Sequence, residues 1–132
     1  MIYLDTSAAI KALIGEDRSE AMRELLDSEQ RFVSSRLFAL ELAAVTQRRN
    51  ADPDASERLL SRVDLVSLDD SVVDQAVVAR SDLRALDALH LATALRLKDG
   101  VDSMLSFDKE LLDQARAQGI PPHPLVGSDP AR

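Results

Sequence analysis

The segment IYLDTSAAIKALI, residues 2–14, decides the fold class of this chain. Residues 2–4 form a short apolar run that is typical of a buried β-strand. Residues 5–7, Asp-Thr-Ser, are all types that cap helices well, and residues 8–14 predict a short helix that Gly15 ends. A strand that passes directly into a helix is the repeating unit of α/β proteins.

The same alternation of strand and helix continues along the chain. Further apolar runs predict strands at residues 31–34, 63–67, 103–106 and 123–126. Helical spacing and capping residues predict helices at residues 16–28, 36–49, 53–62, 68–80, 83–98 and 108–117. Ser81 or Asp82 is the expected cap of the helix that ends near residue 98. We therefore predict an α/β fold whose parallel sheet of four to five strands is covered on both faces.

Length and composition limit the classes of protein to be considered. The 132 residues predict a single domain, which we place at residues 1–126, with residues 127–132 as a C-terminal tail. The chain has no cysteine, which excludes a disulfide framework, a cysteine-ligated zinc site and a thiol nucleophile. It has no signal-peptide pattern and no apolar run that could span a membrane, so we expect a soluble cytoplasmic protein.

The charge balance is acidic, with a net charge of −7 from 23 acidic and 16 basic residues. This balance disfavours a protein that coats nucleic acid with general positive charge. It still allows an enzyme that contacts nucleic acid through metal ions.

Two acidic residues follow predicted strands. Asp5 comes directly after the first strand, and Asp108 comes two residues after the strand at 103–106. In open α/β sheets the carboxyl ends of the strands border the ligand crevice. The alternative for both residues is a simple helix N-cap, although Thr6 or Ser7 could cap the first helix instead. Ser106 could orient a neighbouring carboxylate or a water molecule.

Glu41 interrupts an apolar helix face in the segment RLFALELAAV, residues 36–45. The apolar stripe of this segment consists of Leu37, Leu40, Ala44 and Val45. A carboxylate on such a stripe is costly unless another group compensates it. The alternative is a glutamate at the edge of the stripe that reaches water or pairs with Arg48.

Asp87 lies in ALDALHLATAL, residues 85–95, which is apolar almost all round and therefore predicts a buried central helix. The alternative is an acid in the first turn that is favoured by the helix dipole. His90 is three residues further on and could bond Asp87. On this apolar helix we interpret His90 as a satisfied core residue rather than a metal ligand.

Four gathered carboxylates would repel one another unless a cation compensated them. An all-oxygen cluster without histidine or cysteine ligands favours Mg²⁺ or Mn²⁺ over zinc. Such a site suits phosphodiester hydrolysis, which needs no side-chain nucleophile. The chain has neither a GxxxxGK[ST] phosphate loop nor a GxGxxG fingerprint.

Three motifs resemble those of a known family. LDTSA at residues 4–8, DALHLATA at 87–94 and SFD at 106–108, with a helical glutamate at residue 41, are similar to PIN-domain proteins of the VapC type, the toxins of bacterial and archaeal toxin–antitoxin pairs. The resemblance implies a three-layer α/β/α fold and a Mg²⁺- or Mn²⁺-dependent endoribonuclease. The family's acids correspond to Asp5, Glu41, Asp87 and Asp108.

Roles for these residues follow as expectations. Asp5, Asp87 and Asp108 would hold the metal, and Glu41 would bind metal or orient the attacking water. Thr6 or Ser7, and Ser106, correspond to the small hydroxyl residues near the family's site. The resemblance also implies a homodimer and a VapB-like antitoxin whose C-terminal segment covers the acidic pocket.

RNA would need a local basic patch, because the chain as a whole is acidic. The candidates by nearness in sequence to the site are Arg36, Arg48, Arg49, Arg80 and Arg84, of which Arg36 and Arg84 are preferred. The alternative is a scattered set of arginines that are solvated and paired with acids. Two other functions remain open: a PIN-fold binding module without catalysis, and a metal-dependent phosphatase acting on small phosphate esters.

Overall fold

A computed structural model describes residues 1–15 and 18–127 and contains a four-stranded, fully parallel sheet. Its strands are β1 (Ile2–Leu4), β2 (Phe32–Ser35), β3 (Val63–Val66) and β4 (Ser103–Leu105). They lie in the order β3-β2-β1-β4, so that β1 is a central strand. Ile2 is accordingly paired with Phe32 on one side and with Ser103 on the other. The predicted parallel sheet and four of its predicted strands are confirmed.

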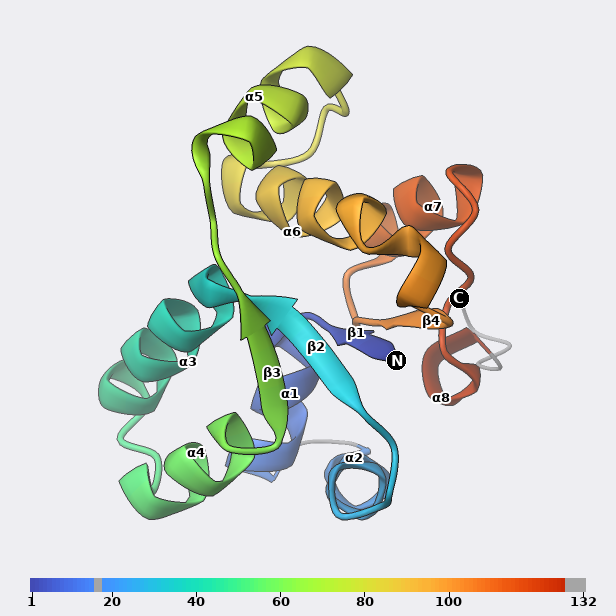
Figure 1. The fold of residues 1–132 in the computed structure, drawn as a ribbon. Coiled ribbons are helices and arrows are strands. Elements are labelled where there is room, and N and C mark those ends of the chain that lie inside the picture. Colours follow the sequence, from blue (N-terminus) through green and yellow to red (C-terminus); the bar gives the residue numbers. More distant parts are fainter. Residues whose placement is uncertain (16–17, 128–132) are drawn as a thin grey trace.

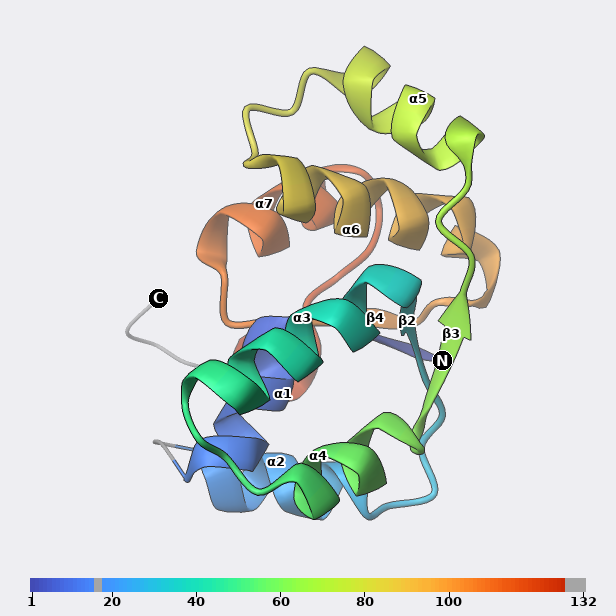
Figure 2. The same ribbon diagram turned by 90° about the vertical axis from the view of Figure 1, so that its left-hand side faces the viewer.

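Helices cover both faces of this sheet, which gives the expected three layers (Figures 1 and 2). One layer contains α1 (Thr6–Ile14), α2 (Ser19–Leu26), α3 (Arg36–Arg48) and α4 (Pro53–Leu60). The opposite layer contains α5 (Asp70–Ala79), α6 (Ala85–Arg96) and α7 (Lys109–Ala117). A 3₁₀ turn at Lys98–Gly100 and the short α8 (Pro124–Gly127) complete the described elements. None of the helices within the described ranges is long and apolar enough to cross a membrane.

The predicted fifth strand at residues 123–126 is wrong. After one isolated parallel bridge between Met104 and Pro122, the chain turns into α8. Three of the four residues at 121–124 are prolines, which have no N–H to donate to a ladder. His123 alone donates there, to the carbonyl of Met104 at 2.9 Å. Pro124 then takes the first helical position, where a proline is well accommodated.

α6 and α2 both begin later than predicted. α6 begins at Ala85, and neither Ser81 nor Asp82 caps it, because Arg80 and Asp82 have positive φ angles of 49° and 65° that break the helical path. α2 begins at Ser19, and residues 16–17 of the predicted helix lie outside the described residues. The predicted tail, apart from Gly127, also lies outside them.

The strand order determines where a site can form. From β1 the chain proceeds through β2 to β3 on one side, and β4 is then added on the other side of β1. Ligands of open α/β sheets bind outside the carboxyl ends of the strands at such a change of direction. That position is the end of β1 and β4, where the Asp5 N–H donates to the Leu105 carbonyl at 3.0 Å.

Candidate active site

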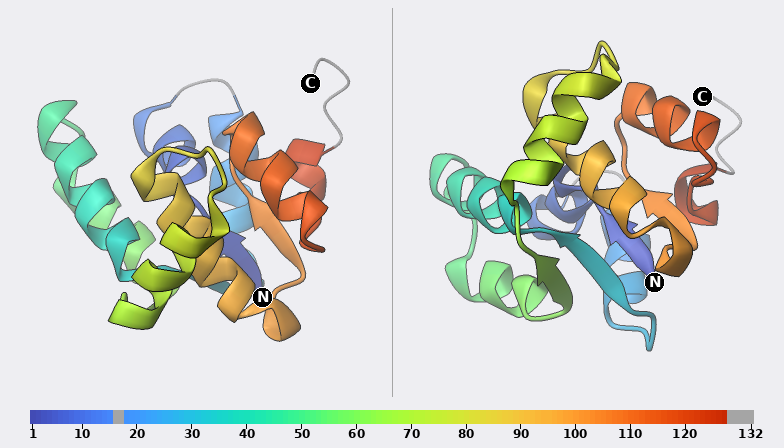
Figure 3. Two further views of the ribbon diagram at one scale, coloured as in Figure 1. Left: turned by 90° about the horizontal axis from the view of Figure 1, so that it is seen from above. Right: turned by 45° about the horizontal axis from the view of Figure 1, so that its top comes forward.

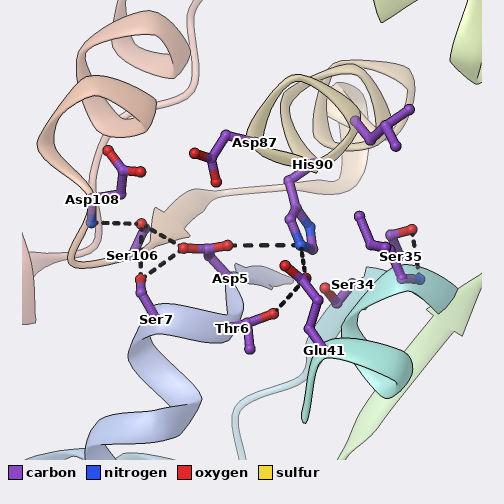
Figure 4. A network of polar contacts seen from close by, with 12 residues as sticks. Asp5, Thr6, Ser7, Ser34, Ser35, Glu41, Asp87, His90, Ser106 and Asp108 are labelled. Carbon is purple, nitrogen blue, oxygen red and sulfur yellow. Dashed lines mark hydrogen bonds and ion pairs between the residues drawn. The ribbon is translucent and has the colours of Figure 1, made fainter. Parts of the chain in front are cut away.

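Asp5 lies at the floor of the site and is only 4% exposed. It occupies the N-cap position of α1, but its side chain makes no capping hydrogen bond, so the capping alternative for this carboxylate is wrong. Its Oδ2 accepts hydrogen bonds from Ser7 Oγ at 2.7 Å and from Ser106 Oγ at 2.9 Å (Figure 4). The carboxylate is therefore held by two hydroxyls, while Oδ1 faces the other side of the site.

The two serine hydroxyls are themselves fixed by the backbone that follows β4. Phe107 N–H donates to Ser7 Oγ, and Asp108 N–H donates to Ser106 Oγ, both at 2.9 Å. Each hydroxyl thus accepts a hydrogen bond from a backbone N–H of the loop and donates a hydrogen bond to Asp5 Oδ2. This arrangement fixes the rotamer of Asp5 and joins the ends of β1 and β4 through side chains as well as through the sheet.

Glu41 approaches the site from α3, and its side chain is 20% exposed. Its Oε1 accepts from Thr6 Oγ1 at 2.7 Å and from His90 Nε2 at 2.6 Å. Burial alone would raise the pKa of Glu41, but the hydrogen bond and charge of His90, together with the Thr6 hydrogen bond, hold it below its ordinary value. Glu41 is therefore an anchored carboxylate at the edge of the buried face, as the alternative supposed, but its partners are Thr6 and His90 rather than Arg48.

The apolar stripe of α3 differs from the predicted one. Leu40 is 68% exposed and Ala44 is also exposed. The side chains that α3 buries are Leu37, Phe38, Leu42, Val45 and Thr46. Glu41 lies at the border of this buried face, which lets its carboxylate reach the site while its stem packs against the protein.

Asp87 lies in the first turn of α6, as the dipole alternative supposed, and it also faces the other carboxylates. Burial and the nearby charges of Asp108 and Asp5 raise its pKa to about 6. The exposed Arg84, whose Nε is 3.7 Å from Asp87 Oδ2, opposes this shift. Burial and the charges of two neighbouring carboxylates, Asp108 and Asp5, thus disfavour ionisation of Asp87.

Asp108 serves two purposes. As the N-cap of α7 it accepts from the Leu111 N–H at 3.2 Å, which confirms the capping alternative. Its side chain is also near enough to Asp87 to raise the pKa of that residue by charge and by a hydrogen bond. In Figure 4 the carboxylates of Asp87 and Asp108 lie side by side above Asp5.

The sequence model of the PIN domain matches residues 2–117. The chain belongs to the PIN-domain family. Two similar relatives are proteins of Mycobacterium tuberculosis. Ribonuclease VapC46 is 36% identical over 121 residues, covering 90% of this chain and 93% of the relative. Ribonuclease VapC47 is 34% identical over 128 residues, covering 91% and 93%.

Solved structures share this PIN-domain fold. One is Mycobacterium tuberculosis VapC20, a toxin described as cleaving the sarcin–ricin loop, with a TM-score of 0.69 and 20% identity over 91% of this chain and 96% of that one. Another is a toxin–antitoxin complex from Klebsiella pneumoniae, with a TM-score of 0.62 and 19% identity over 80% and 85%. The family match over residues 2–117 includes all four acids.

The donor set of this PIN domain suits a hard divalent cation. All four carboxylates offer oxygen, and a cation would offset the charges of Asp108 and Asp5 that, together with burial, raise the pKa of Asp87. Within the described ranges no three acidic or histidine side chains form a ready-made cage. Mg²⁺ does not need one, because it keeps several waters and binds through one or two carboxylates.

Two residues of this PIN domain were not predicted to belong to the site. His90 bonds Glu41 rather than Asp87, and its Nδ1 lies 2.8 Å from the hydroxyl of Tyr3. Both side chains are fully buried. The interpretation of His90 as a satisfied core residue is confirmed. The signal in the sequence for its contact with the site was a polar residue on an otherwise apolar helix.

The preferred arginines have different surroundings. Arg84 stands at the rim of the acidic site beside Asp87, with a side chain that is 90% exposed. Arg36 is the exposed first residue of α3. Arg84 is thus an exposed cation at the site, in an ion pair with Asp87.

Proposed function

We propose that this PIN domain is a divalent-metal-dependent endoribonuclease and the toxin of a toxin–antitoxin pair. The observation that carries the proposal is the convergence of Asp5, Glu41, Asp87 and Asp108, from four different elements, at the carboxyl end of β1 and β4. The VapC ribonucleases at 34–36% identity support the same activity.

Asp5, Asp87 and Asp108 are the residues that would hold Mg²⁺ or Mn²⁺. When bound, such an ion lowers the pKa of water and neutralises charge on the scissile phosphate. Ser7 and Ser106 keep Asp5 in one rotamer, which leaves its Oδ1 available to a ligand. Glu41 either adds a ligand or orients the attacking water through the oxygen that Thr6 and His90 do not occupy.

The test uses the purified protein with a structured RNA and either Mg²⁺ or Mn²⁺. Asp5→Asn should lower the cleavage rate by at least about a thousandfold, because one ligand charge is removed while the side-chain volume is kept. The matched control is Asp64→Asn, an exposed residue of β3 whose Oδ2 lies 3.4 Å from Arg31 Nη2. Full activity of Asp5→Asn, or cleavage that persists with EDTA, would refute the metal site. Hydrolysis of an aryl phosphate without RNA cleavage would indicate a phosphatase instead.

We propose that the antitoxin covers the acidic site with a segment that carries Lys or Arg. Burial and the charges of Asp108 and Asp5 raise the pKa of Asp87, and a cation in that segment would offset those charges. The toxin–antitoxin complex with the same fold supports a partner of this kind. Expression with and without a candidate antitoxin gene, with growth and RNA cleavage scored together, tests the pairing.

We also propose a homodimer that forms through α5. This helix lies outermost over α6 (Figure 3). Of its ten residues only Val72 is buried, while Val77 and Val78 are 70% and 77% exposed. Its acidic residues Asp70 and Asp74 lie near its first turns, and Arg80 caps its other end. Two copies packed antiparallel would place these opposite charges together.

Sedimentation equilibrium tests the dimer. The wild-type protein should have twice the chain mass, and Val77→Glu should have the mass of one chain. Ala117→Glu on the exposed face of α7 adds the same charge elsewhere and should stay dimeric. A wild-type monomer would refute the proposal.

A further inference from the structure

Tyr3 and His90 form a buried polar chain that ends on Glu41. The Tyr3 hydroxyl lies 2.8 Å from His90 Nδ1, and His90 Nε2 lies 2.6 Å from Glu41 Oε1. Tyr3 and His90 are both 0% exposed. Figure 4 shows His90 reaching down from α6 between Asp5 and Glu41. Neither Tyr3 nor His90 belongs to the proposed metal ligands.

The direction of the central hydrogen bond follows from the chemistry of the two groups. A carboxylate can only accept, so the proton of the 2.6 Å contact is carried by His90 Nε2. The same N–H also faces Asp5, whose Oδ1 is 3.7 Å away. The other ring nitrogen is occupied by Tyr3, and the Tyr3 and His90 rings meet edge to face at 79° with centroids 5.8 Å apart. Ring flipping or rotation of His90 would break these contacts.

The hydrogen bonds from Thr6 and His90 make the two carboxylate oxygens of Glu41 different. Oε1 receives both Thr6 Oγ1 and His90 Nε2, whereas Oε2 has no hydrogen-bond donor among the residues that the structure describes. A glutamate that is partly exposed would otherwise sample several rotamers. The two donors hold it in one, with a single oxygen left for a water molecule or ion.

α6 therefore positions two side chains of the candidate site, on successive turns of the helix. Asp87 faces Asp5 and Asp108, and His90, three residues later, faces Glu41. One helix thus sets the position of the proposed ligand and of the carboxylate opposite it. A histidine that only fills the core would not need to donate a hydrogen bond to a carboxylate of the candidate site, as His90 does to Glu41.

We propose that His90, held by Tyr3, is a positioning residue that orients the Glu41 carboxylate and presents Oε2 to the attacking water. The inference rests on the proposed ribonuclease function. Residues that orient the groups of a metal site through hydrogen bonds contribute about 10–100-fold to affinity or activity.

The kinetic test compares three substitutions of similar volume. His90→Leu should lower kcat about 10–100-fold with little change in KM. His90→Gln, which keeps an N–H donor, should recover a large part of that loss, and Tyr3→Phe should lower kcat by a few fold. A His90→Leu/Glu41→Gln double variant should be no slower than Glu41→Gln alone, because both act through one carboxylate.

A measurement on the metal-free protein tests the geometry independently of activity. The His90 Nε2 proton should give a downfield proton NMR signal that disappears in Glu41→Ala and persists in Asp64→Asn. Tyr3→Phe provides a second variant if His90→Leu does not fold, because it removes one hydroxyl and keeps the ring.

The outcomes separate the two proposals. RNA cleavage that is equal in the wild type and in Asp5→Asn would refute the proposed metal-dependent ribonuclease site. An active wild type in which His90→Leu folds and retains full kcat would overturn only the positioning role. Losses that add in the double variant, or a missing Nε2 signal, would overturn it as well.

Discussion

The hydroxyl of Ser106 donates a 2.9 Å hydrogen bond to Asp5 Oδ2 and so joins two residues that are 101 positions apart in the sequence. Ser106 is fully buried and also accepts from the Asp108 N–H. One hydroxyl therefore orients a proposed metal ligand at the end of β1 and the loop that carries another ligand after β4.

Ser106→Ala should destabilise the protein by about 1–3 kcal/mol, because the Asp108 N–H loses its buried acceptor. It should also slow RNA cleavage, because Asp5 is then held only by Ser7. Urea unfolding followed by circular dichroism gives the free energy. Ser106→Thr keeps the hydroxyl and should be close to wild type in both respects. A loss of equal size in Ser106→Thr would assign the effect to packing instead.

The raised pKa of Asp87 makes metal-free stability depend on pH. In the folded protein this pKa is about 6, against an ordinary value of 3.8, so the folded state binds the proton more tightly than the unfolded chain does. Its contribution is fully present below pH 3.8 and is lost as the pH rises through about 6. Asp87→Asn should therefore be more stable than the wild type at pH 7, by about 1–2 kcal/mol after screening by solvent.

Urea unfolding at pH 4 and at pH 7 measures this effect in the presence of EDTA. The difference in free energy of unfolding between Asp87→Asn and wild type should grow from the lower to the higher pH. Asp74→Asn, on the exposed face of α5, is the control and should show no such change. A difference that is constant with pH contradicts the cause given for the shift.

Divalent ions should offset the loss of stability that ionised Asp87 causes at neutral pH. Mn²⁺ or Mg²⁺ should raise the melting temperature at pH 7.5, since an ion that binds only the folded state stabilises it. The shift should be smaller at pH 5, where Asp87 is protonated. Differential scanning calorimetry with and without Mn²⁺ measures it, and Asp5→Asn should abolish it. An equal shift in Asp5→Asn would place the ion elsewhere.

Arg84 should bind RNA rather than take part in the chemistry. Its side chain is 90% exposed beside Asp87, so Arg84→Gln should raise the KM for RNA several fold and leave kcat nearly unchanged. The salt dependence of binding should become weaker by about one phosphate contact. Arg58→Gln, exposed on α4, is the matched control. Loss of kcat at constant KM would mean that Arg84 acts on the site itself, through Asp87.

Strands and acids that depend on local pattern were predictable. Residues 2–4, the capping sequence after them and the apolar helix around Asp87 all identify their elements without tertiary information. The fifth strand was predicted wrongly, because the apolar run at residues 123–126 is typical of a strand. The neighbouring prolines lack N–H groups, and only one bridge, between Met104 and Pro122, forms among the described residues. Leu40 was wrongly assigned to the buried face of α3, although it is exposed. The edge of that face, where Glu41 lies, is set by the packing of α3 against the rest of the protein.

The Tyr3–His90–Glu41 chain could not be predicted for a different reason. Its members are 87 and 49 positions apart, and their contacts depend on how α6 is placed over β2 and against α3. Periodicity assigned His90 correctly to the core. It contains no information about which carboxylate a buried imidazole meets.

The position of β4 beside β1 has a consequence for synthesis. The site needs Asp5 from the start of the chain and residues up to Asp108 from near its end, and the pairing that joins them closes a loop of about 100 residues. Forming contacts of such high sequence separation is slow. The nascent chain therefore cannot assemble the acidic cluster until its last strand has been made, so we expect the growing polypeptide to lack the proposed ribonuclease activity while it is still on the ribosome.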